Sequence, residues 1–378
     1  MIGGAALQSE QVPAGERAAR IAWARLVEPK DAEAVSLISR VGAEEALFSL
    51  DPGSKLGRRL APRLEVLDVR RDLHVAAKLG ARVLVPGDDE WPTGLDDLAT
   101  RPFCLWVRGP LHLREACERS ASVVGARAAT HYGTRQSSEI AAGLAERRFT
   151  VVSGAAYGID GAAHRGALAA EGATVAFTAG GVDRPYPRGH DDLFARIVAA
   201  GLVVSEVPPG CAPTSWRFLS RNRLIATVSQ GTVVVEAGLR SGSLNTAKTA
   251  LDHHRLVGAV PGSVESAVSA GCHQWIREGK ATLVTDAAEV AELVGPMGEL
   301  APTKRGQQRP DDDLEPRQRL VLAALPVRRA VTTADVAKAC AQVPADVLGA
   351  LAVMQVRGLV TRDEEGRWRK VTAARSTG

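Results

Sequence analysis

The chain has few cysteines, and they form none of the patterns that bind metals or build disulfide frameworks. They number five, are widely spaced and contain no C-x-x-C pair. This distribution argues against a disulfide-stapled fold and a cysteine-rich zinc site, and it is typical of a reducing compartment. A chain of 378 residues is long enough to bury large apolar cores without such crosslinks. The cysteines are Cys104, Cys117, Cys211, Cys272 and Cys340.

Long apolar runs are also missing. No stretch of about 18 uninterrupted apolar residues occurs, and residues 1–10 lack the basic start and apolar run of a leader peptide. We therefore expect a cytoplasmic protein that makes no contact with a membrane.

A strong excess of positive charge is missing from the centre of the chain. The net charge is +4, and basic residues outnumber acidic ones in the segment from Leu314 onward, which leaves the remainder close to neutral. Bulk charge therefore cannot hold nucleic acid on the central part of the chain. Any such site there requires a local cluster of arginines.

The segments that flank the centre read as small helical modules. Residues 1–62 predict a helical domain of the SAM or helix-hairpin-helix type, with Asp31 as a helix N-cap and residues 58–62 as the start of a linker. Residues 296–313 are rich in Pro, Gly and charge and predict a second linker. Residues 314–378 predict three helices and a β-hairpin, which is the order of a winged helix, with Thr332 or Thr333 capping the second helix.

Residues 63–295 alternate short apolar runs with longer helical segments. Several runs are almost wholly apolar, as strands buried on both faces require. The alternation predicts an α/β fold with a Rossmann-like, doubly wound and mostly parallel sheet. The runs are 82–85, 103–107, 122–124, 150–152, 174–178, 202–205, 232–235, 256–260 and 282–284.

The first candidate site follows the run at 122–124, where Gly125 and Arg127 lie in a strand-to-helix turn. The dinucleotide fingerprint G-x-G-x-x-G is lacking because Arg127 stands where its second glycine would be. A guanidinium there is suited to gripping one phosphate at a helix N-terminus, although an ordinary turn with an exposed arginine has the same pattern. We therefore expect no NAD binding and no other cofactor.

The second candidate turn begins with Ser153 and Gly154, whose small size lets a ligand approach the backbone. Asp160 and His164 follow, four positions apart and thus on one helix face. A metal site would need another ligand from elsewhere in the chain. A local hydrogen-bonded pair that fixes the turn is the interpretation we favour.

The third candidate is an arginine and aromatic cluster that holds Phe218, Arg221, Asn222 and Arg223. Phosphates favour arginine, and unpaired bases favour an aromatic face on which to stack. The alternative is an amphipathic helix with a solvated basic face.

The fourth candidate is a Ser/Gly turn that opens a helix, with Ser241, Gly242, Ser243, Thr246 and Lys248. It either offers hydroxyls and amides to an anion or is a simple N-cap by Ser241 or Ser243. In a parallel sheet all four turns lie at the carboxyl ends of strands, so we expect them to converge on one edge.

Together these motifs resemble the DNA-processing protein A (DprA/Smf) family. The resemblance implies single-stranded DNA binding without catalysis, a homodimer, protection of the DNA taken up in natural transformation, and delivery of a RecA-type recombinase to that DNA. For the dimer we expect a contribution from Trp275 and Ile276, adjacent apolar residues on a late helix. The motifs that carry the resemblance are Gly125-Ala126-Arg127, Ser153-Gly154, Phe218 with Arg221-Asn222-Arg223, and Ser241-Gly242-Ser243.

Two other functions stay open at this point. The first is a nucleotide-processing enzyme resembling the phosphoribohydrolases, with Glu236 as general base, although their GGxGTxxE turn is absent. The second is a winged-helix transcription regulator. Its recognition helix would be residues 345–357, which carry Arg357 as their only basic residue, whereas groove reading needs outward polar side chains.

Overall fold

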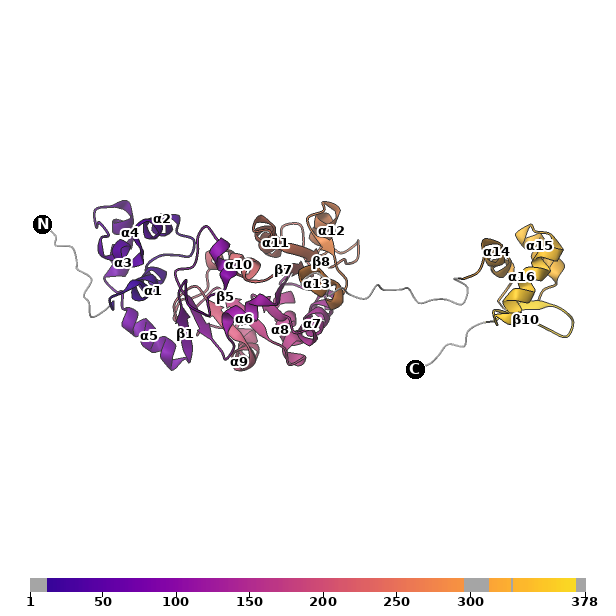
Figure 1. Cartoon of the computed structure of the whole chain (residues 1–378), viewed down its shortest axis with the longest axis horizontal. Coiled ribbons are helices and arrows are strands. Elements are labelled where there is room, and N and C mark those ends of the chain that lie inside the picture. Colours follow the sequence, from indigo (N-terminus) through magenta and orange to yellow (C-terminus); the bar gives the residue numbers. More distant parts are fainter. Residues whose placement is uncertain (1–11, 296–312, 328, 372–378) are drawn as a thin grey trace. The chain divides into compact units, whose positions relative to one another are not determined.

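The computed structural model describes residues 12–295, 313–327 and 329–371, which form two compact units, residues 1–301 and 302–378. The linker expected at 296–313 therefore lies, apart from Asp313, outside the described residues. The first unit contains a nine-stranded sheet with helices against both faces (Figure 1). The strands are β1 Ala81–Leu84, β2 Leu105–Arg108, β3 Ser120–Val124, β4 Thr150–Ser153, β5 Thr174–Thr178, β6 Leu202–Ser205, β7 Gly231–Val234, β8 Leu256–Ala259 and β9 Thr282–Leu283.

The sheet has the mixed α/β, mostly parallel arrangement that the sequence predicts. Its strand order is β1-β2-β6-β5-β4-β3-β7-β8-β9, and β2 alone runs in the direction opposite to the other eight strands. From β3 the chain winds outward through β4, β5 and β6, and then returns to place β7, β8 and β9 on the other side of β3. The order of winding thus reverses between β3 and β7. That is the point at which open α/β sheets commonly bind ligands.

Both faces of the central strands are buried, which explains their nearly continuous apolar sequence. On β4, Val151 belongs to one apolar cluster and Val152 to another, and on β7 Val233 and Val234 divide in the same way. Because successive side chains of a strand point to opposite faces, each cluster marks one face of the sheet. From α6 onward the helices of this unit are α6 Leu113–Glu118, α7 His131–Glu146, α8 Ile159–Ala169, α9 Asp191–Ala200, α10 Ser215–Val228, α11 Gly242–Asp252, α12 Ala270–Arg277 and α13 Ala287–Val294. Short 3-10 turns lie at Thr93–Asp97 and Arg188–His190.

The N-terminal helices share a core with the sheet instead of forming a separate body. Trp23 of α1 lies with its ring centroid 6.5 Å from that of Phe103 beside β2, and one apolar cluster includes both. Asp31 caps α2 as expected, accepting a hydrogen bond from the amide of Ala34. These helices are α1 Glu16–Leu26, α2 Ala32–Val41, α3 Ala43–Phe48, α4 Lys55–Leu64 and α5 Val69–Lys78.

The linker expected at residues 58–62 is wrong, because this segment lies within α4. The helix begins at the N-cap Ser54, and Leu56 and Leu60 are buried one turn apart. Pro62 lies in the last turn, where its missing amide leaves one helical hydrogen bond unmade. The boundary drawn at residue 62 therefore falls inside a helix.

The second unit has its own apolar core around Leu322, Val347 and Trp368. Its described residues follow the expected order of three helices and a hairpin, and Thr332 caps the second helix. The winged-helix assignment of this unit stays a prediction. Its elements are α14 Pro316–Ala324, α15 Thr333–Cys340, α16 Pro344–Val356, β10 Val360–Arg362 and β11 Trp368–Lys370.

Candidate nucleic-acid interface

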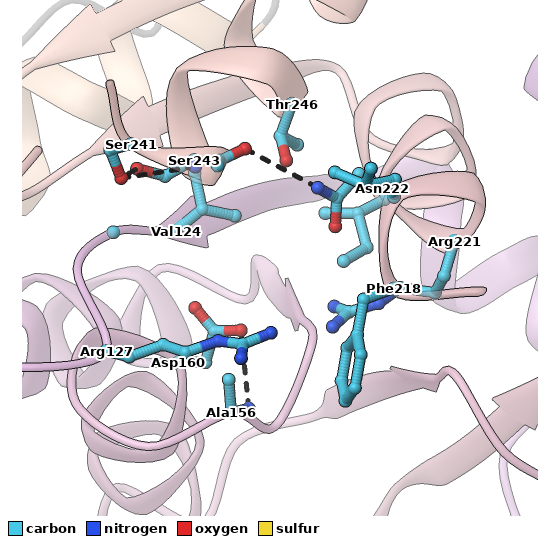
Figure 2. A pocket seen from close by; sticks show the side chains of 14 residues that line it. Val124, Arg127, Ala156, Asp160, Phe218, Arg221, Asn222, Ser241, Ser243 and Thr246 are labelled. Carbon is cyan, nitrogen blue, oxygen red and sulfur yellow. Dashed lines mark hydrogen bonds between the residues drawn. The ribbon is translucent and has the colours of Figure 1, made fainter. Parts of the chain in front are cut away.

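The turns after β3 and β4 and the start of α11, after β7, meet α10 in one cleft of about 200 Å³ (Figure 2). It lies at the carboxyl ends of these strands, beside the point between β3 and β7 where the winding reverses. The convergence expected from the parallel arrangement is therefore present. The lining residues are Val124, Gly125, Arg127, Ala156, Asp160, Phe218, Leu219, Arg221, Asn222, Ile225, Ser241, Gly242, Ser243 and Thr246.

Arg127 lies exposed at the mouth of the cleft, in the turn after β3. Its guanidinium carbon is 4.6 Å from the ring centroid of Phe218, which is a cation–π contact. No described acidic residue forms an ion pair with it. The turn is shaped by the amide of Ala126, which donates to the carbonyl of Glu236 at 2.7 Å. Arg127 is therefore a free cation held on an aromatic face.

Arg221 is a buried cation without a hydrogen-bond partner among the described residues. Its side chain lines the cleft although the residue is only 5% exposed, and its buried Nε atom has no acceptor. Burial lowers the pKa of Arg221 to about 10; nearby Asp160 acts in the opposite direction, and Arg127 lowers it further. Burying an unpaired guanidinium is unfavourable, so an anion that entered the cleft would relieve a cost that the free protein carries.

Asp160 lies in the floor of the cleft and accepts a weak hydrogen bond of 3.4 Å from the amide of Ala156. Burial raises the pKa of Asp160, although Arg221 and Arg127 both act to lower it. The expected pair of Asp160 and His164 is wrong. The imidazole Nδ1 of His164 lies 2.7 Å from Thr174 Oγ1 instead, because both side chains are buried against β4 and β5.

The N-terminus of α11 forms the opposite wall of the cleft. Ser241 is the N-cap, and its hydroxyl lies 2.7 Å from that of Ser243. The amide of Asn222 on α10 reaches the carbonyl of Gly242 at 3.5 Å, which ties the two helices together. The N-cap interpretation therefore holds for Ser241. The two hydroxyls also face the cleft, where each can donate to an oxyanion.

Four of the candidate residues do not line the cleft. Ser153 is fully buried and donates to the carbonyl of Val123 at 2.6 Å, because it still belongs to β4. Lys248 is exposed farther along α11 and forms an ion pair of 2.7 Å with Asp252. Gly154 lies behind Arg221 and leaves room for its guanidinium. The remaining residue is Arg223.

Arg223 lies on α10 and is turned into the protein. Its guanidinium pairs with both carboxylate oxygens of Glu206, at 2.6 and 2.7 Å, and donates to the carbonyl of Thr100. The residue is 5% exposed. The structure thus places Arg223 in a buried ion pair that joins α10 to the segment after β6, and away from the cleft.

Sequence reasoning missed two tyrosines near the mouth of the cleft. The ring of Tyr186 lies 5.4 Å from that of Phe218, and Tyr157 packs edge-on against His190 at 4.9 Å. Both tyrosines are about half exposed. The only signal in the sequence was an aromatic residue within or beside a Gly/Pro-rich turn. They extend the aromatic surface on which bases can stack.

Glu236, the general base of the enzyme alternative, has both carboxylate oxygens occupied. One accepts from the amide of Thr130 at 2.9 Å and the other from its hydroxyl at 2.5 Å, and the residue is 1% exposed. Thr130 in turn caps α7. Glu236 therefore clamps the turn that presents Arg127, and it is not among the residues that line the cleft.

Three further features of the described residues concern α12, metal ligands and helix length. Trp275 and Ile276 of α12 are half-buried against the core. In the described ranges no group of three His, Cys, Asp or Glu side chains is placed to hold a metal ion. No single helix of the described segments is long and apolar enough to cross a bilayer; α15 and α16 pass that test only as a pair bent by 108°.

Residues 82–295 match the family described as DNA recombination-mediator protein A. The putative DNA processing protein DprA of Mycobacterium tuberculosis H37Rv is 45% identical over 369 residues, which cover 93% of this chain and 94% of that protein. The X-ray structure of DprA from Streptococcus pneumoniae is 30% identical, with a TM-score of 0.64, and covers 75% of this chain and 99% of that one.

A structure of DprA from Helicobacter pylori, described as giving insight into its single-stranded DNA binding mode, has a TM-score of 0.50 and 24% identity. It covers 56% of this chain and 93% of that one. At this identity the likeness concerns the fold.

Proposed function

The chain belongs to the DprA/Smf family of DNA-processing proteins, and on that premise we propose that its cleft binds single-stranded DNA without catalysing a reaction. The observation that carries the proposal is Arg221, a buried guanidinium that lines the cleft and has no partner among the described side chains. A phosphate is the anion that a guanidinium binds with two parallel hydrogen bonds. The chemistry of the cleft is thus that of a phosphate site.

The preference for a single strand follows from the aromatic residues beside the arginines. The ring of Phe218 contacts both the guanidinium of Arg127 and the ring of Tyr186. An unpaired base can stack on such a face, whereas the bases of a duplex are already stacked on one another. Phosphate contacts carry no base identity, so the binding has little sequence dependence.

The partners that we propose rest on the family. The bound strand is protected and delivered to a RecA-type recombinase, and the protein acts as a homodimer to which Trp275 and Ile276 contribute. Sedimentation at tens of micromolar protein tests the dimer, and a monomer would remove that part of the proposal. The proposed location is the cytoplasm, and no cofactor is needed.

The test of the central proposal is an anisotropy titration with single-stranded and double-stranded DNA of one sequence, repeated with a second sequence. We expect tighter binding of the single strand and similar affinities for the two sequences. Equal or tighter binding of the duplex would contradict the proposal. Calorimetry with NAD is the companion measurement, and micromolar affinity for NAD would contradict the expected absence of a cofactor.

A further inference from the structure

Trp216 is an indole that the fold leaves half exposed in the first turn of α10. It is 51% exposed, whereas Trp23, Trp91, Trp106 and Trp368 are 3% exposed or less. Burial of a large aromatic ring is strongly favourable, so an exposed one at a structured position leaves contact area available to a ligand.

The indole borders a hollow of about 320 Å³ between α10 and the N-terminal helices. The residues between α1 and α2, together with Arg59, Leu60 and Arg63 of α4, form its other walls. The Nζ atom of Lys30 lies 5.9 Å from the centroid of the indole ring. An aromatic face beside a cation is the combination that proteins use to hold an unpaired nucleotide, with the base on the ring and the phosphate on the cation.

Lys30 is the free charge of this hollow. Arg217 and Arg63 both bind Glu28, at 2.8 and 3.3 Å, and Arg59 binds Asp31 at 2.7 Å. Lys30 is exposed, and no described acidic side chain forms an ion pair with it. A phosphate at Lys30 would therefore not have to displace an existing ion pair.

The first turns of α10 connect this hollow to the cleft. Successive positions on a helix are rotated by about 100°, so Phe218 and Trp216 point to different sides, and Leu219 occupies the arc between them. Phe218 and Leu219 line the cleft, and Leu219 is 52% exposed. An exposed apolar stripe thus runs from the cleft around α10 to Trp216.

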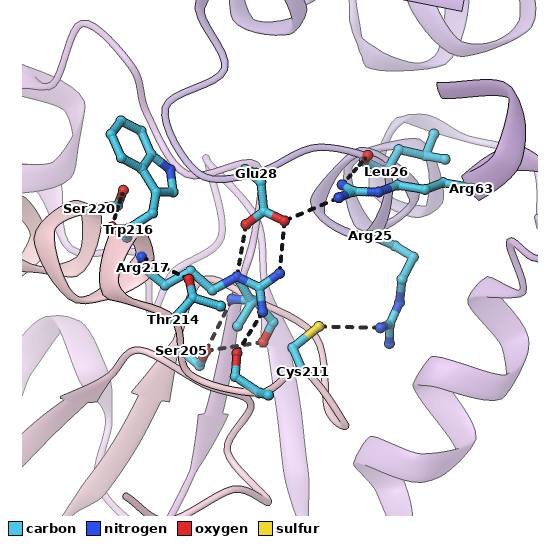
Figure 3. A network of polar contacts seen from close by, with 12 residues as sticks. Arg25, Leu26, Glu28, Arg63, Ser205, Cys211, Thr214, Trp216, Arg217 and Ser220 are labelled. Atoms are coloured by element: carbon cyan, nitrogen blue, oxygen red, sulfur yellow. Dashed lines mark hydrogen bonds and ion pairs between the residues drawn. The ribbon is translucent and has the colours of Figure 1, made fainter. Parts of the chain in front are cut away.

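The turn that carries Trp216 is held rigidly. Arg217 binds both carboxylate oxygens of Glu28, at 2.8 and 3.0 Å, and donates to the carbonyl of Ala212 (Figure 3). Thr214 caps the helix. Figure 3 shows the indole projecting away from this ion pair. Because these contacts fix the backbone that carries the indole, binding there does not have to order this turn.

We propose that Trp216 and Lys30 form a second nucleotide-binding site for the same DNA strand, which leaves the cleft over Leu219 and stacks a base on Trp216. This inference rests on the proposed function, since it extends the path of a strand that is already bound at Arg127 and Arg221. The site adds affinity only to strands long enough to reach beyond the cleft. Short strands bind the cleft alone.

The experiment uses the full chain and oligothymidylates of about 4 and about 16 nucleotides, lengths that bracket common single-strand sites. Trp216→Ala removes the ring on which one base stacks. It should therefore weaken binding of the long strand by roughly 5- to 100-fold and leave the affinity for the short strand unchanged. Lys30→Ala should flatten the log–log salt slope for the long strand by about 0.7. Lys55 is an exposed lysine of α4 outside the hollow, so Lys55→Ala is the matched control and should leave the salt slope unchanged.

Tryptophan fluorescence gives a second measurement that does not depend on affinity. A base stacked on Trp216 should quench its emission, so saturating long DNA should quench the wild type and Trp91→Phe, the control at a buried tryptophan, but not Trp216→Phe. Quenching that persists in Trp216→Phe, or equal loss of short and long strands in Trp216→Ala, overturns the second site. If the wild type binds neither strand, the proposed function fails as well. Binding that depends on Arg127 but not on Trp216 overturns the second site alone.

Discussion

The guanidinium of Arg221 occupies the space that a side chain at Gly154 would need, since a Cβ atom at residue 154 would overlap its Nη1 atom. Gly154 follows β4 and Arg221 belongs to α10, so the contact joins two of the segments that build the cleft. The glycine therefore serves to seat the buried arginine. The sequence predicted that Gly154 would let a ligand approach the backbone. In the structure this glycine leaves room for the side chain of Arg221 instead.

The first prediction concerns this contact. Gly154→Ala should displace Arg221 and weaken single-stranded DNA binding about as much as Arg221→Ala does, by roughly 10- to 100-fold for a lost charged hydrogen bond. Anisotropy titration of both variants and of the double variant measures the coupling. Because Gly154 acts through Arg221, the double variant should be no weaker than Arg221→Ala. Additive losses would contradict this interpretation.

The second prediction concerns Arg127. Arg127→Ala should cost about 1.5–3 kcal/mol of binding free energy and flatten the log–log salt slope by about 0.7. Stability should hardly change because the side chain is exposed. Titrations at several salt concentrations test it, with circular dichroism to verify folding. Lys248→Ala is the control, since that lysine is paired with Asp252 outside the cleft. A folded Arg127→Ala with unaltered affinity would exclude the proposed phosphate contact.

The third prediction separates a clamp from a catalytic base at Glu236. Glu236→Ala leaves the amide and hydroxyl of Thr130 without their acceptor, so it should lower both the free energy of unfolding, by about 1–3 kcal/mol, and the DNA affinity. Glu236→Gln keeps one acceptor and should have a smaller effect. Neither the wild type nor the variants should release base from nucleoside monophosphates. Base release that Glu236→Gln abolishes would favour the hydrolase alternative.

The fourth prediction concerns acid. Burial lowers the pKa of His164 from 6.5 to about 3, and His190, Arg221 and Arg165 act in the same direction. Below pH 6.5 the imidazole of His164 is protonated in the unfolded chain but stays neutral in the folded protein. The free energy of unfolding therefore falls as the pH drops from about 6.5 toward about 3. The slope approaches about 1.4 kcal/mol per pH unit. Denaturant unfolding at pH 7, 6 and 5 should show a shallower slope for His164→Asn. Parallel slopes would assign the effect to other groups.

The fifth prediction concerns the C-terminal unit. A chain that ends at Ala301 retains the whole of the first unit and every residue that lines the cleft, so it should bind single-stranded DNA nearly as well as the full chain. The basic tail should add only weak, salt-sensitive affinity. A shortened chain that folds but has lost nearly all binding would show that the cleft is not the main site.

The sequence determined the parts of the fold that depend on local pattern. All nine apolar runs became strands. The central strands β3 to β7 are buried at every position, and strands buried on both faces favour nearly continuous apolar sequence. The convergence of the polar turns after β3, β4 and β7 was also predictable. Once the strands are parallel and joined by helices, their carboxyl ends must share an edge. Nine of the thirteen residues proposed for that edge line the cleft.

Only the tertiary structure decided what each polar side chain does there. Arg221 and Arg223 are two positions apart on α10, and the sequence cannot tell them apart. Because two positions rotate by about 200° around a helix, Arg221 faces the cleft unpaired and Arg223 binds Glu206 inside the protein. Thr130, which donates to Glu236, and Lys30, which lies beside Trp216, likewise come from segments more than 100 positions away from these partners. Contacts of that range leave no periodic trace in a sequence, since they depend on how separate elements pack.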